Sequence, residues 1–142
     1  MVTARHLLEK KPRALRAIEP EAPVLDAIRL MAEHHIGALV VMRQDELLGI
    51  VSERDYARKV ILLGRSSAHT PVREIMTSPV ITMSPLNTLE ECMHVVTQQR
   101  VRYLPVIENG RVIGILSLGD LIKAVIEEQQ RTIEQLENYI HS

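Results

Sequence analysis

An internal repeat constrains this chain more than any other feature of its sequence. The heptapeptides GIVSERD, which begins at Gly49, and GILSLGD, which begins at Gly114, lie 65 positions apart, and apolar positions around them stay in register at that offset. Such self-similarity indicates one structural unit used twice. A unit of only about 65 residues is marginally stable alone. We therefore expect two repeats that share a buried interface, and two candidate sites related by approximate symmetry.

Each repeat is predicted to run strand, helix, strand, strand, helix, which gives an α+β fold. In the first repeat the strands are expected at residues 16–18, 38–42 and 47–51, with helices beginning at Val24 and Ser52. In the second repeat the strands are expected at residues 80–82, 103–107 and 112–116, with helices at 88–99 and from about Leu118. Asn109-Gly110 is a strong signal for a hairpin turn. The expected domains are repeat 1 at 7–64, a linker at 65–79, repeat 2 at 80–124 and a helical extension at 125–142.

The helical extension has a hydrophobic pattern of its own, with spacings that alternate between four and three residues. Its members are Ile122, Ile126, Gln129, Ile133, Leu136 and Ile140. This pattern is typical of a helix that pairs with another helix, with Gln129 as a polar position that fixes the register. The alternative is an amphipathic helix that folds back on its own core, near Leu7 and Leu8. The sequence leaves both interpretations open.

Composition and motifs argue against several classes of function. The formal net charge is −1 and the chain has neither Trp nor Phe, so neither a basic surface nor a stacking platform for nucleic acid is expected. No apolar run approaches the roughly 20 residues of a transmembrane helix, and the single cysteine fits a reducing compartment, so a cytoplasmic protein without a membrane partner is expected. His34-His35 has no metal-ligand spacing, and no metal is expected. We find no nucleophile, phosphate-cradling or paired-carboxylate motif, so no catalysis is predicted.

The repeated Ser–Asp pairs allow two interpretations. Ser52 with Asp55, and Ser117 with Asp120, have the spacing of a helix cap. The preceding glycines stand inside apolar strands, where glycine often marks the close approach of a ligand. An aspartate at such a position can accept hydrogen bonds from the vicinal hydroxyls of a ribose, and a helix N-terminus favours phosphate. One carboxylate can serve both roles.

Taken together, these features resemble a tandem cystathionine-β-synthase (CBS) domain pair, or Bateman module, of the stand-alone bacterial type. The resemblance rests on the repeat order, the prolines Pro20 and Pro85 after the short strands, the run RYLPVIENGRVIGILSLGD and the paired G-h-x-S-x-x-D ends. It covers about residues 7–124. It implies two repeats packed through their sheets with pseudo-two-fold symmetry. It also implies two clefts, of which one or both hold an adenosine-containing ligand such as AMP, ATP, NADH or S-adenosylmethionine.

The resemblance also implies roles for individual residues. The ribose is expected at Ser52, Asp55, Ser117 and Asp120. Phosphate is expected at Arg102 and Arg54. Adenine is expected at Ala17, Ile18, Ala38, Val40, Thr82 and Met83. Gly37 stands at the position equivalent to Arg102, and Gly119 at the position equivalent to Arg54, so two sites of unequal affinity are expected.

The resemblance finally implies a non-catalytic regulatory module, with an adenine nucleotide as its ligand. Such a module would sense energy or redox state in signal transduction, form a homodimer and act on an effector protein in trans. The alternative is a structural dimerisation module without a physiological nucleotide ligand, in which the Ser–Asp pairs are only helix caps.

Overall fold

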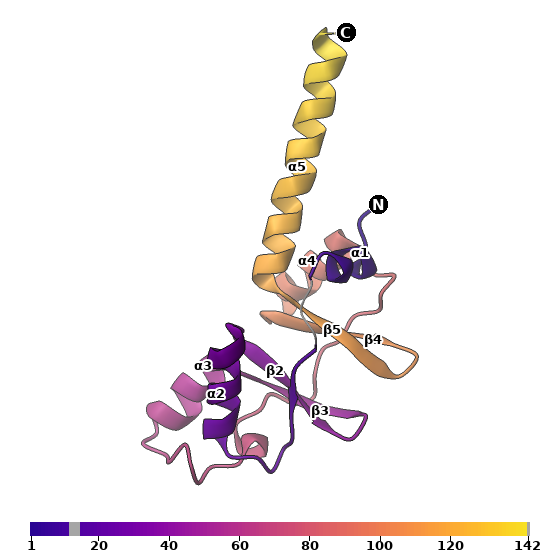
Figure 1. Ribbon diagram of the computed structural model, residues 1–142. Coiled ribbons are helices and arrows are strands. Elements are labelled where there is room, and N and C mark those ends of the chain that lie inside the picture. Colours follow the sequence, from indigo (N-terminus) through magenta and orange to yellow (C-terminus); the bar gives the residue numbers. More distant parts are fainter. Residues whose placement is uncertain (12–14, 142) are drawn as a thin grey trace. The chain divides into compact units, whose positions relative to one another are not determined.

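The computed structural model describes residues 1–11 and 15–141, and the chain divides into two compact units (Figure 1). We call Ala14–Ile81 the repeat-1 unit, and Met1–Arg13 together with Thr82–Ser142 the repeat-2 unit. Each unit contains helices packed with a small sheet, so the predicted α+β class is confirmed.

The repeat-1 unit is built on a three-stranded sheet in the order β1-β2-β3. β1 (Ala17–Ile18) runs parallel to β2 (Ala38–Arg43), and β2 is antiparallel to β3 (Glu46–Ser52). A parallel connection needs a crossover, which α2 provides. The helical elements of this unit are α2 (Val24–His34), α3 (Glu53–Tyr56), the π-helical turn η1 (Ala57–Ile61) and the 3-10 turn η2 (Val72–Glu74).

The core of the repeat-1 unit lies between α2 and one face of its sheet. Val24, Ala27 and Met31 are buried at helical spacing on α2. Alternate residues of the strands meet them, because successive side chains of a strand point to opposite faces. The strand members of this cluster are Leu39, Val41 and Val51.

The repeat-2 unit has a two-stranded sheet, in which β4 (Tyr103–Glu108) is antiparallel to β5 (Arg111–Ser117). Asn109 and Gly110 join the strands with φ angles of 51° and 78°, so the predicted hairpin turn is confirmed. The helices of this unit are α1 (Ala4–Glu9), α4 (Leu89–Gln99) and α5 (Leu118–His141).

The strand predicted at residues 80–82 is absent from the described structure. Met83 instead makes a single parallel bridge to Val106. Its N–H donates to Pro105 O at 2.9 Å, and its carbonyl accepts from the N–H of Ile107 at 2.9 Å. The pairing ends there because the chain turns at once, with Asn87 N–H bonded to Ser84 O at 3.0 Å, and Pro85 has no N–H to continue a ladder.

The N-terminal residues 1–11 pack on the second repeat. Ala4 N–H donates to Asn87 O at 2.8 Å, and Leu89 N–H donates to Val2 O at 2.9 Å. Residues 7–11 therefore lie in the repeat-2 unit, although the sequence boundaries placed them in repeat 1. The predicted boundary of repeat 1 is based on the order of elements along the chain. That order gives no information about contacts between the N-terminus and residues 87–89, which are far away in the sequence.

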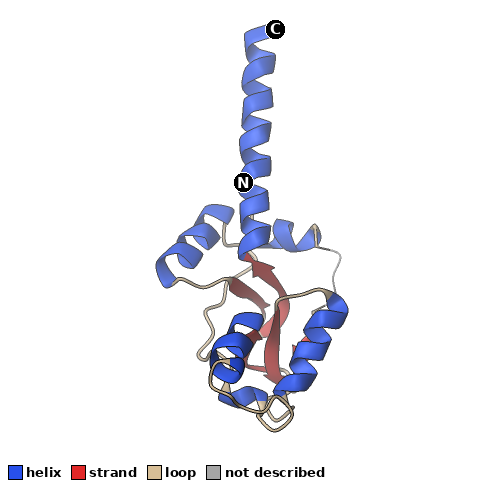
Figure 2. Cartoon of the chain, turned by 90° about the vertical axis from the view of Figure 1, so that its left-hand side faces the viewer, coloured by secondary structure: helices blue, strands red, loops and turns tan. Residues whose placement is uncertain are grey.

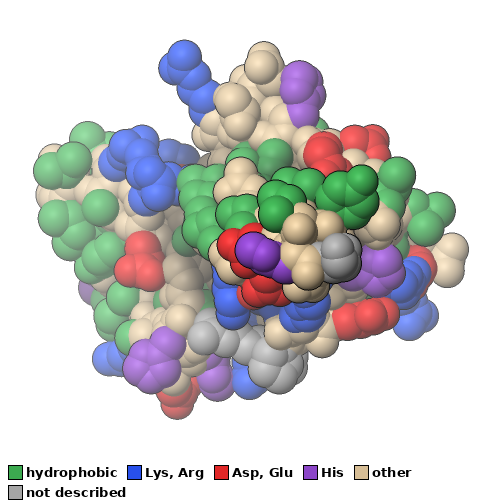
Figure 3. Space-filling view, turned by 90° about the horizontal axis from the view of Figure 1, so that it is seen from above, with side chains coloured by type: hydrophobic (Ala, Val, Ile, Leu, Met, Phe, Trp, Pro, Cys, Tyr) green, Lys and Arg blue, Asp and Glu red, His purple; other side chains and the backbone are tan. Residues whose placement is uncertain are grey.

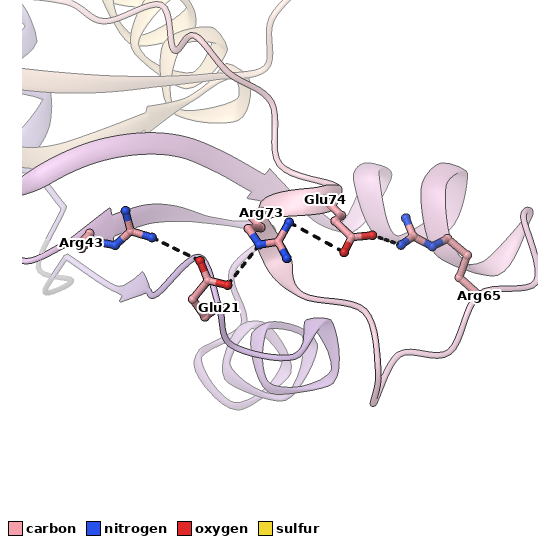
Figure 4. Close-up of polar contacts among 5 residues, drawn as sticks. All are labelled: Glu21, Arg43, Arg65, Arg73 and Glu74. Atoms are coloured by element: carbon pink, nitrogen blue, oxygen red, sulfur yellow. Dashed lines mark hydrogen bonds and ion pairs between the residues drawn. The ribbon is translucent and has the colours of Figure 1, made fainter.

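Residues 65–79, predicted to be a linker, form an integral part of the repeat-1 unit. Val72 and Ile75 are fully buried, and Val24 N–H donates to Thr70 O at 2.8 Å. A chain of ion pairs adds to this attachment: Arg43–Glu21 at 3.2 Å, Glu21–Arg73 at 3.0 Å, Arg73–Glu74 at 3.9 Å, and Glu74–Arg65 (Figure 4). A segment rich in Ser, Thr and Pro resembles a linker in composition, but here its few apolar residues join the core.

α5 continues well beyond the other helices of the repeat-2 unit (Figure 2). Leu121 and Ala124 in its first half are buried. Farther along, Ile126, Leu136 and Ile140 are 59%, 58% and 72% exposed. The apolar stripe of α5 is therefore not folded back on Leu7 and Leu8, and this alternative is wrong.

Candidate functional site

Both Ser–Asp pairs form reciprocal helix caps at the junction of a strand with a helix. In the first repeat Asp55 N–H donates to Ser52 Oγ at 3.2 Å, and Ser52 N–H donates to Asp55 Oδ2 at 3.0 Å. In the second repeat Asp120 N–H donates to Ser117 Oγ at 3.1 Å, and Ser117 N–H donates to Asp120 Oδ2 at 2.8 Å. The capping interpretation is confirmed in both repeats, and each carboxylate is held in a fixed orientation.

The strand register of the repeat-1 unit brings several predicted site residues to one end of its sheet. Ser52 at the end of β3 pairs with Ala38 at the start of β2, and Ala17 pairs with Val40. Ala38 and Val40 are buried, whereas Ala17 is exposed and Ile18 half-buried. Arg54 is exposed in the first turn of α3, two residues after Ser52.

The repeat-2 unit places its predicted site residues in the equivalent order. Ser117 pairs with Tyr103, and Met83, which is buried, bridges to Val106. Thr82 is exposed. Arg102 is exposed next to Tyr103, and its carbonyl accepts from Leu118 N–H at 2.8 Å at the start of α5.

Arg102, which is predicted to bind phosphate, therefore lies beside the junction of β5 with α5. In the first repeat, Gly37 O accepts from Glu53 N–H at 3.0 Å, which is the same contact at the equivalent position. The backbone is thus equivalent in the two repeats, while the side chain differs. At this position the two repeats make the same backbone hydrogen bond. They differ in the side chain, which is arginine in the second repeat and absent in the first, where the residue is glycine.

The two glycines that precede the Ser–Asp pairs do not leave space for a ligand, contrary to the sequence interpretation. A Cβ at Gly49 would lie 2.6 Å from Met76 Sδ and 2.9 Å from Thr77 O. A Cβ at Gly114 would lie 2.7 Å from Leu8 Cδ2. The protein itself fills both spaces, so these glycines are required for close packing of Met76 and Thr77 at Gly49 and of Leu8 at Gly114.

A lysine that sequence reasoning missed binds each of the two carboxylates. Lys59 Nζ lies 3.0 Å from Asp55 Oδ1 and donates to Ile75 O at 2.9 Å. Lys11 Nζ lies 2.7 Å from Asp120 Oδ2 and donates to Ile115 O at 2.8 Å. The spacing of Lys59, four residues after Asp55, is a readable helical signal. Lys11 is 109 residues from Asp120, and no sequence pattern points to it.

The lysine contact determines the protonation behaviour of Asp120. Partial burial of this carboxyl raises its pKa, but the hydrogen bonds from Lys11 and from the Ser117 N–H outweigh burial and lower the pKa below its ordinary value. Asp120 is therefore a carboxylate at neutral pH, which is the form that accepts hydrogen bonds from hydroxyl groups.

The described part of the chain lacks two kinds of feature. Within residues 1–11 and 15–141 there is no group of three or more His, Cys, Asp or Glu side chains that could hold a metal ion. No helix in the same ranges is long and apolar enough to cross a membrane.

Comparison with known proteins gives consistent results. The CBS domain family model matches residues 13–61 and 72–127. The mitochondrial CBS domain-containing protein CBSX3 of Arabidopsis thaliana is 42% identical over 122 residues, which is 82% of this chain and 59% of that protein, so this chain spans less than two thirds of that relative. The structure of a candidate signal-transduction protein with CBS domains from Burkholderia ambifaria MC40-6 is 47% identical, with a TM-score of 0.86, and the match covers 90% of this chain and 96% of that one.

A third similar structure is that of a hexameric CBS-CP12 protein from bloom-forming cyanobacteria. It is 31% identical, has a TM-score of 0.77, and the match covers 86% of this chain and 71% of that one. The repeat order, the paired caps and these matches agree. The chain therefore belongs to the CBS-domain family and contains two CBS domains.

Proposed function

We propose that this protein is a non-catalytic sensor that binds an adenosine-containing ligand, such as AMP, ATP or NADH, through Asp55 and Asp120. One observation carries the proposal: both repeats hold an ionisable carboxylate in the same reciprocal cap at the same strand-to-helix junction. A cap alone does not require an aspartate at this position, because Glu or Gln at N3 completes the same capping box.

The chemistry of each junction suits the parts of a nucleotide. A carboxylate oriented by its cap can accept hydrogen bonds from two vicinal ribose hydroxyls. The exposed guanidinium groups of Arg102 and Arg54 are donors for phosphate, for which arginine has a suitable planar geometry. The exposed or half-buried edge residues Ala17, Ile18 and Thr82 offer apolar and backbone contacts for adenine, next to the buried Ala38, Val40 and Met83.

A thermal unfolding titration tests the proposal. The ligands are AMP, ATP, NADH and S-adenosylmethionine, with GMP as a control that has the same ribose and phosphate but another base. A ligand at 100 times its Kd stabilises the folded state by about 2.7 kcal/mol, which raises the unfolding midpoint measurably. If no adenosine-containing ligand raises the midpoint, the sensor proposal is contradicted. Equal shifts with GMP would contradict recognition of adenine.

A specific observation also supports self-association through α5. In heptad notation, the a positions of α5 are Ile126, Ile133 and Ile140, and the d positions are Ile122, Gln129 and Leu136. Isoleucine at a with leucine at d favours two parallel strands, and parallel pairing places Gln129 opposite its counterpart in the second copy. The apolar members are between 45% and 72% exposed. Hydrophobic side chains gather along one side of the helix seen end on (Figure 3).

The stripe continues into a groove between α4 and α5. This groove has a volume of about 760 Å³, and its apolar lining includes Leu89, Met93, Val125 and Ile133. We propose that α5 of a second copy covers the stripe and this groove, so that the module is a homodimer that acts on an effector in trans.

One pair of variants tests this homodimer. Ile133→Asp places an acid in the stripe, and Gln135→Asp places the same acid on an exposed position of α5 outside the stripe. Sedimentation velocity should show a dimer for the wild type and Gln135→Asp, and a monomer for Ile133→Asp. Circular dichroism confirms that each variant folds. A monomeric wild type, or a dimer that Ile133→Asp leaves unchanged, contradicts pairing through α5.

A further inference from the structure

Lys11 occupies the carboxylate that the second repeat offers to a ligand. Its ammonium group lies 2.7 Å from Asp120 Oδ2 and 2.8 Å from Ile115 O, and the side chains of Lys11 and Asp120 are each 28% exposed. Ion pairs that are shielded in this way are screened less by solvent than pairs on an open surface. Lys11 is therefore a fixed part of the repeat-2 site.

The segment that carries Lys11 is held in place at several points. Arg5 pairs with Glu108, and Lys10 Nζ lies 3.6 Å from Glu127. The side chain of Leu8 packs against the backbone at Gly114, directly before Ile115. Lys11 lies two residues after the end of α1, and its N–H donates to Leu8 O at 3.0 Å, so its backbone is attached to this anchored helix.

The hydrogen-bonding capacity of Asp120 makes Lys11 a competitor for a diol. Oδ2 already accepts from the Ser117 N–H at 2.8 Å and from Lys11 at 2.7 Å, which uses both of its lone pairs. A pair of vicinal hydroxyls binds a carboxylate through both oxygens. The diol can therefore bind in full only when Lys11 leaves Oδ2.

The first repeat has a similar lysine contact, but its lysine comes from another segment. The residue 65 positions after Lys11 is Met76, which has no charge, and the lysine on Asp55 comes from the same helical segment four residues later. Lys59 is 42% exposed and can turn into solvent by rotation of its own side chain. Asp55 is no less occupied than Asp120, because its Oδ2 accepts from the Ser52 N–H at 3.0 Å and from Ser52 Oγ at 3.1 Å, and its Oδ1 lies 3.0 Å from Lys59 Nζ. The two carboxylates therefore differ in the origin of their lysine, and Asp120 is the one held by a lysine from a distant segment.

We propose that Lys11 determines the affinity of the repeat-2 site, because it occupies Asp120 in competition with a ligand that carries vicinal hydroxyls. The proposal rests on the proposed function, in that both carboxylates bind ribose. Its consequence is that removal of the Lys11 ammonium group changes the affinity of the repeat-2 site and leaves the repeat-1 site as it was.

Isothermal titration with AMP tests this proposal on a matched set of proteins. Lys11→Met keeps the apolar stem and removes the charge, while Lys11→Arg keeps a cation that can remain on Asp120. We expect Lys11→Met to raise the affinity of the repeat-2 site by up to roughly fivefold, the factor that corresponds to the upper value for a partly exposed ion pair. Lys11→Arg should not raise it. Asp120→Asn, added to Lys11→Met, should abolish the gain, which assigns the effect to this site.

The outcomes separate this proposal from the proposed function. If the wild type binds AMP, Asp55→Asn weakens that binding, and Lys11→Met changes nothing, only the role of Lys11 is overturned. Weaker binding by Lys11→Met would identify Lys11 as a contact for the ligand and would also overturn it. If neither the wild type nor Lys11→Met binds AMP, both proposals fail. Lys59→Met is the matched control, and it should leave the affinity of the repeat-2 site unchanged, because Lys59 contacts only Asp55 of the two carboxylates.

Discussion

The two Ser–Asp junctions are nearly identical in their own backbone and different in what surrounds them. Asp55 and Asp120 make the same reciprocal cap, yet one carboxylate contacts a lysine of its own helical segment and the other a lysine from the N-terminal segment. A cap depends on four consecutive residues and is copied when a repeat is duplicated. The neighbours come from segments outside the motif, and these have diverged. Equal motifs therefore do not make equal sites.

Removal of each carboxylate in turn should have the largest effect, and it tests most directly whether the two sites differ. Asp55→Ala and Asp120→Ala should each cost roughly 1.5–3 kcal/mol of binding free energy at their own site, through lost charge-assisted hydrogen bonds. Because each carboxylate belongs to its own site, Asp55→Ala should weaken one phase of an AMP titration and Asp120→Ala the other.

The same two variants also lose a helix cap, so stability must be measured beside affinity. Each should lower the free energy of unfolding by about 1 kcal/mol, the typical net value of one hydrogen bond, because each aspartate accepts the backbone N–H of its N-cap serine. Equal loss of stability with unchanged affinity in both variants would show that the aspartates serve only as caps, and would favour the structural dimerisation module.

The glycines before the two junctions give a second comparison, in stability. A Cβ at Gly49 meets the backbone oxygen of Thr77 at 2.9 Å, which cannot move alone, whereas a Cβ at Gly114 meets only the side chain of Leu8. Overpacking of this kind costs about 1–3 kcal/mol. We expect Gly49→Ala to lower the free energy of unfolding by about 2 kcal/mol, and Gly114→Ala by less than about 1 kcal/mol.

Urea denaturation at neutral pH measures both variants. Gly119→Ala is the control, because the nearest atom to its Cβ is Ser117 Oγ at 3.7 Å and alanine is favoured over glycine in a helix. Equal losses for Gly49→Ala and Gly114→Ala would contradict the difference between a backbone and a side-chain neighbour.

The features that the sequence predicted correctly are those decided by residues close together in the chain. The hairpin at Asn109-Gly110 and the cap of α4 by Thr88 and Glu91 follow from a few adjacent side chains. The repeat itself could be found because the periodic apolar positions of each strand and helix were kept. The Ser–Asp caps belong to the same class.

The features that could not be predicted depend on segments far apart in the chain. Lys11 meets Asp120 across 109 residues, and Leu8 fills the space at Gly114. Val72 and Ile75 look like isolated apolar residues in a polar stretch, but they are fully buried in the repeat-1 unit. Each of these contacts comes from a segment that the sequence boundaries assigned to the other repeat or to a linker, so local patterns held no trace of them.

The pH dependence of stability is the smallest expected effect, and it sharpens the comparison at Asp120. The pKa of this carboxyl is lowered in the folded protein, with the Lys11 hydrogen bond as a main cause. A lowered pKa means that the folded state favours the ionised form. The resulting stability is therefore fully present above the unfolded pKa of about 3.9, and is lost as the pH falls through the lower folded pKa. Because the pair is partly exposed, its contribution should be about 0.2–1 kcal/mol.

Urea unfolding of the wild type and Lys11→Met at pH 7, 5 and 3 measures this contribution. The wild type should be more stable by this amount at pH 7 and 5, and the difference should shrink at pH 3. A difference that stays constant down to pH 3 would mean that Lys11 stabilises the repeat-2 unit through its apolar stem, and that its charge does not hold Asp120.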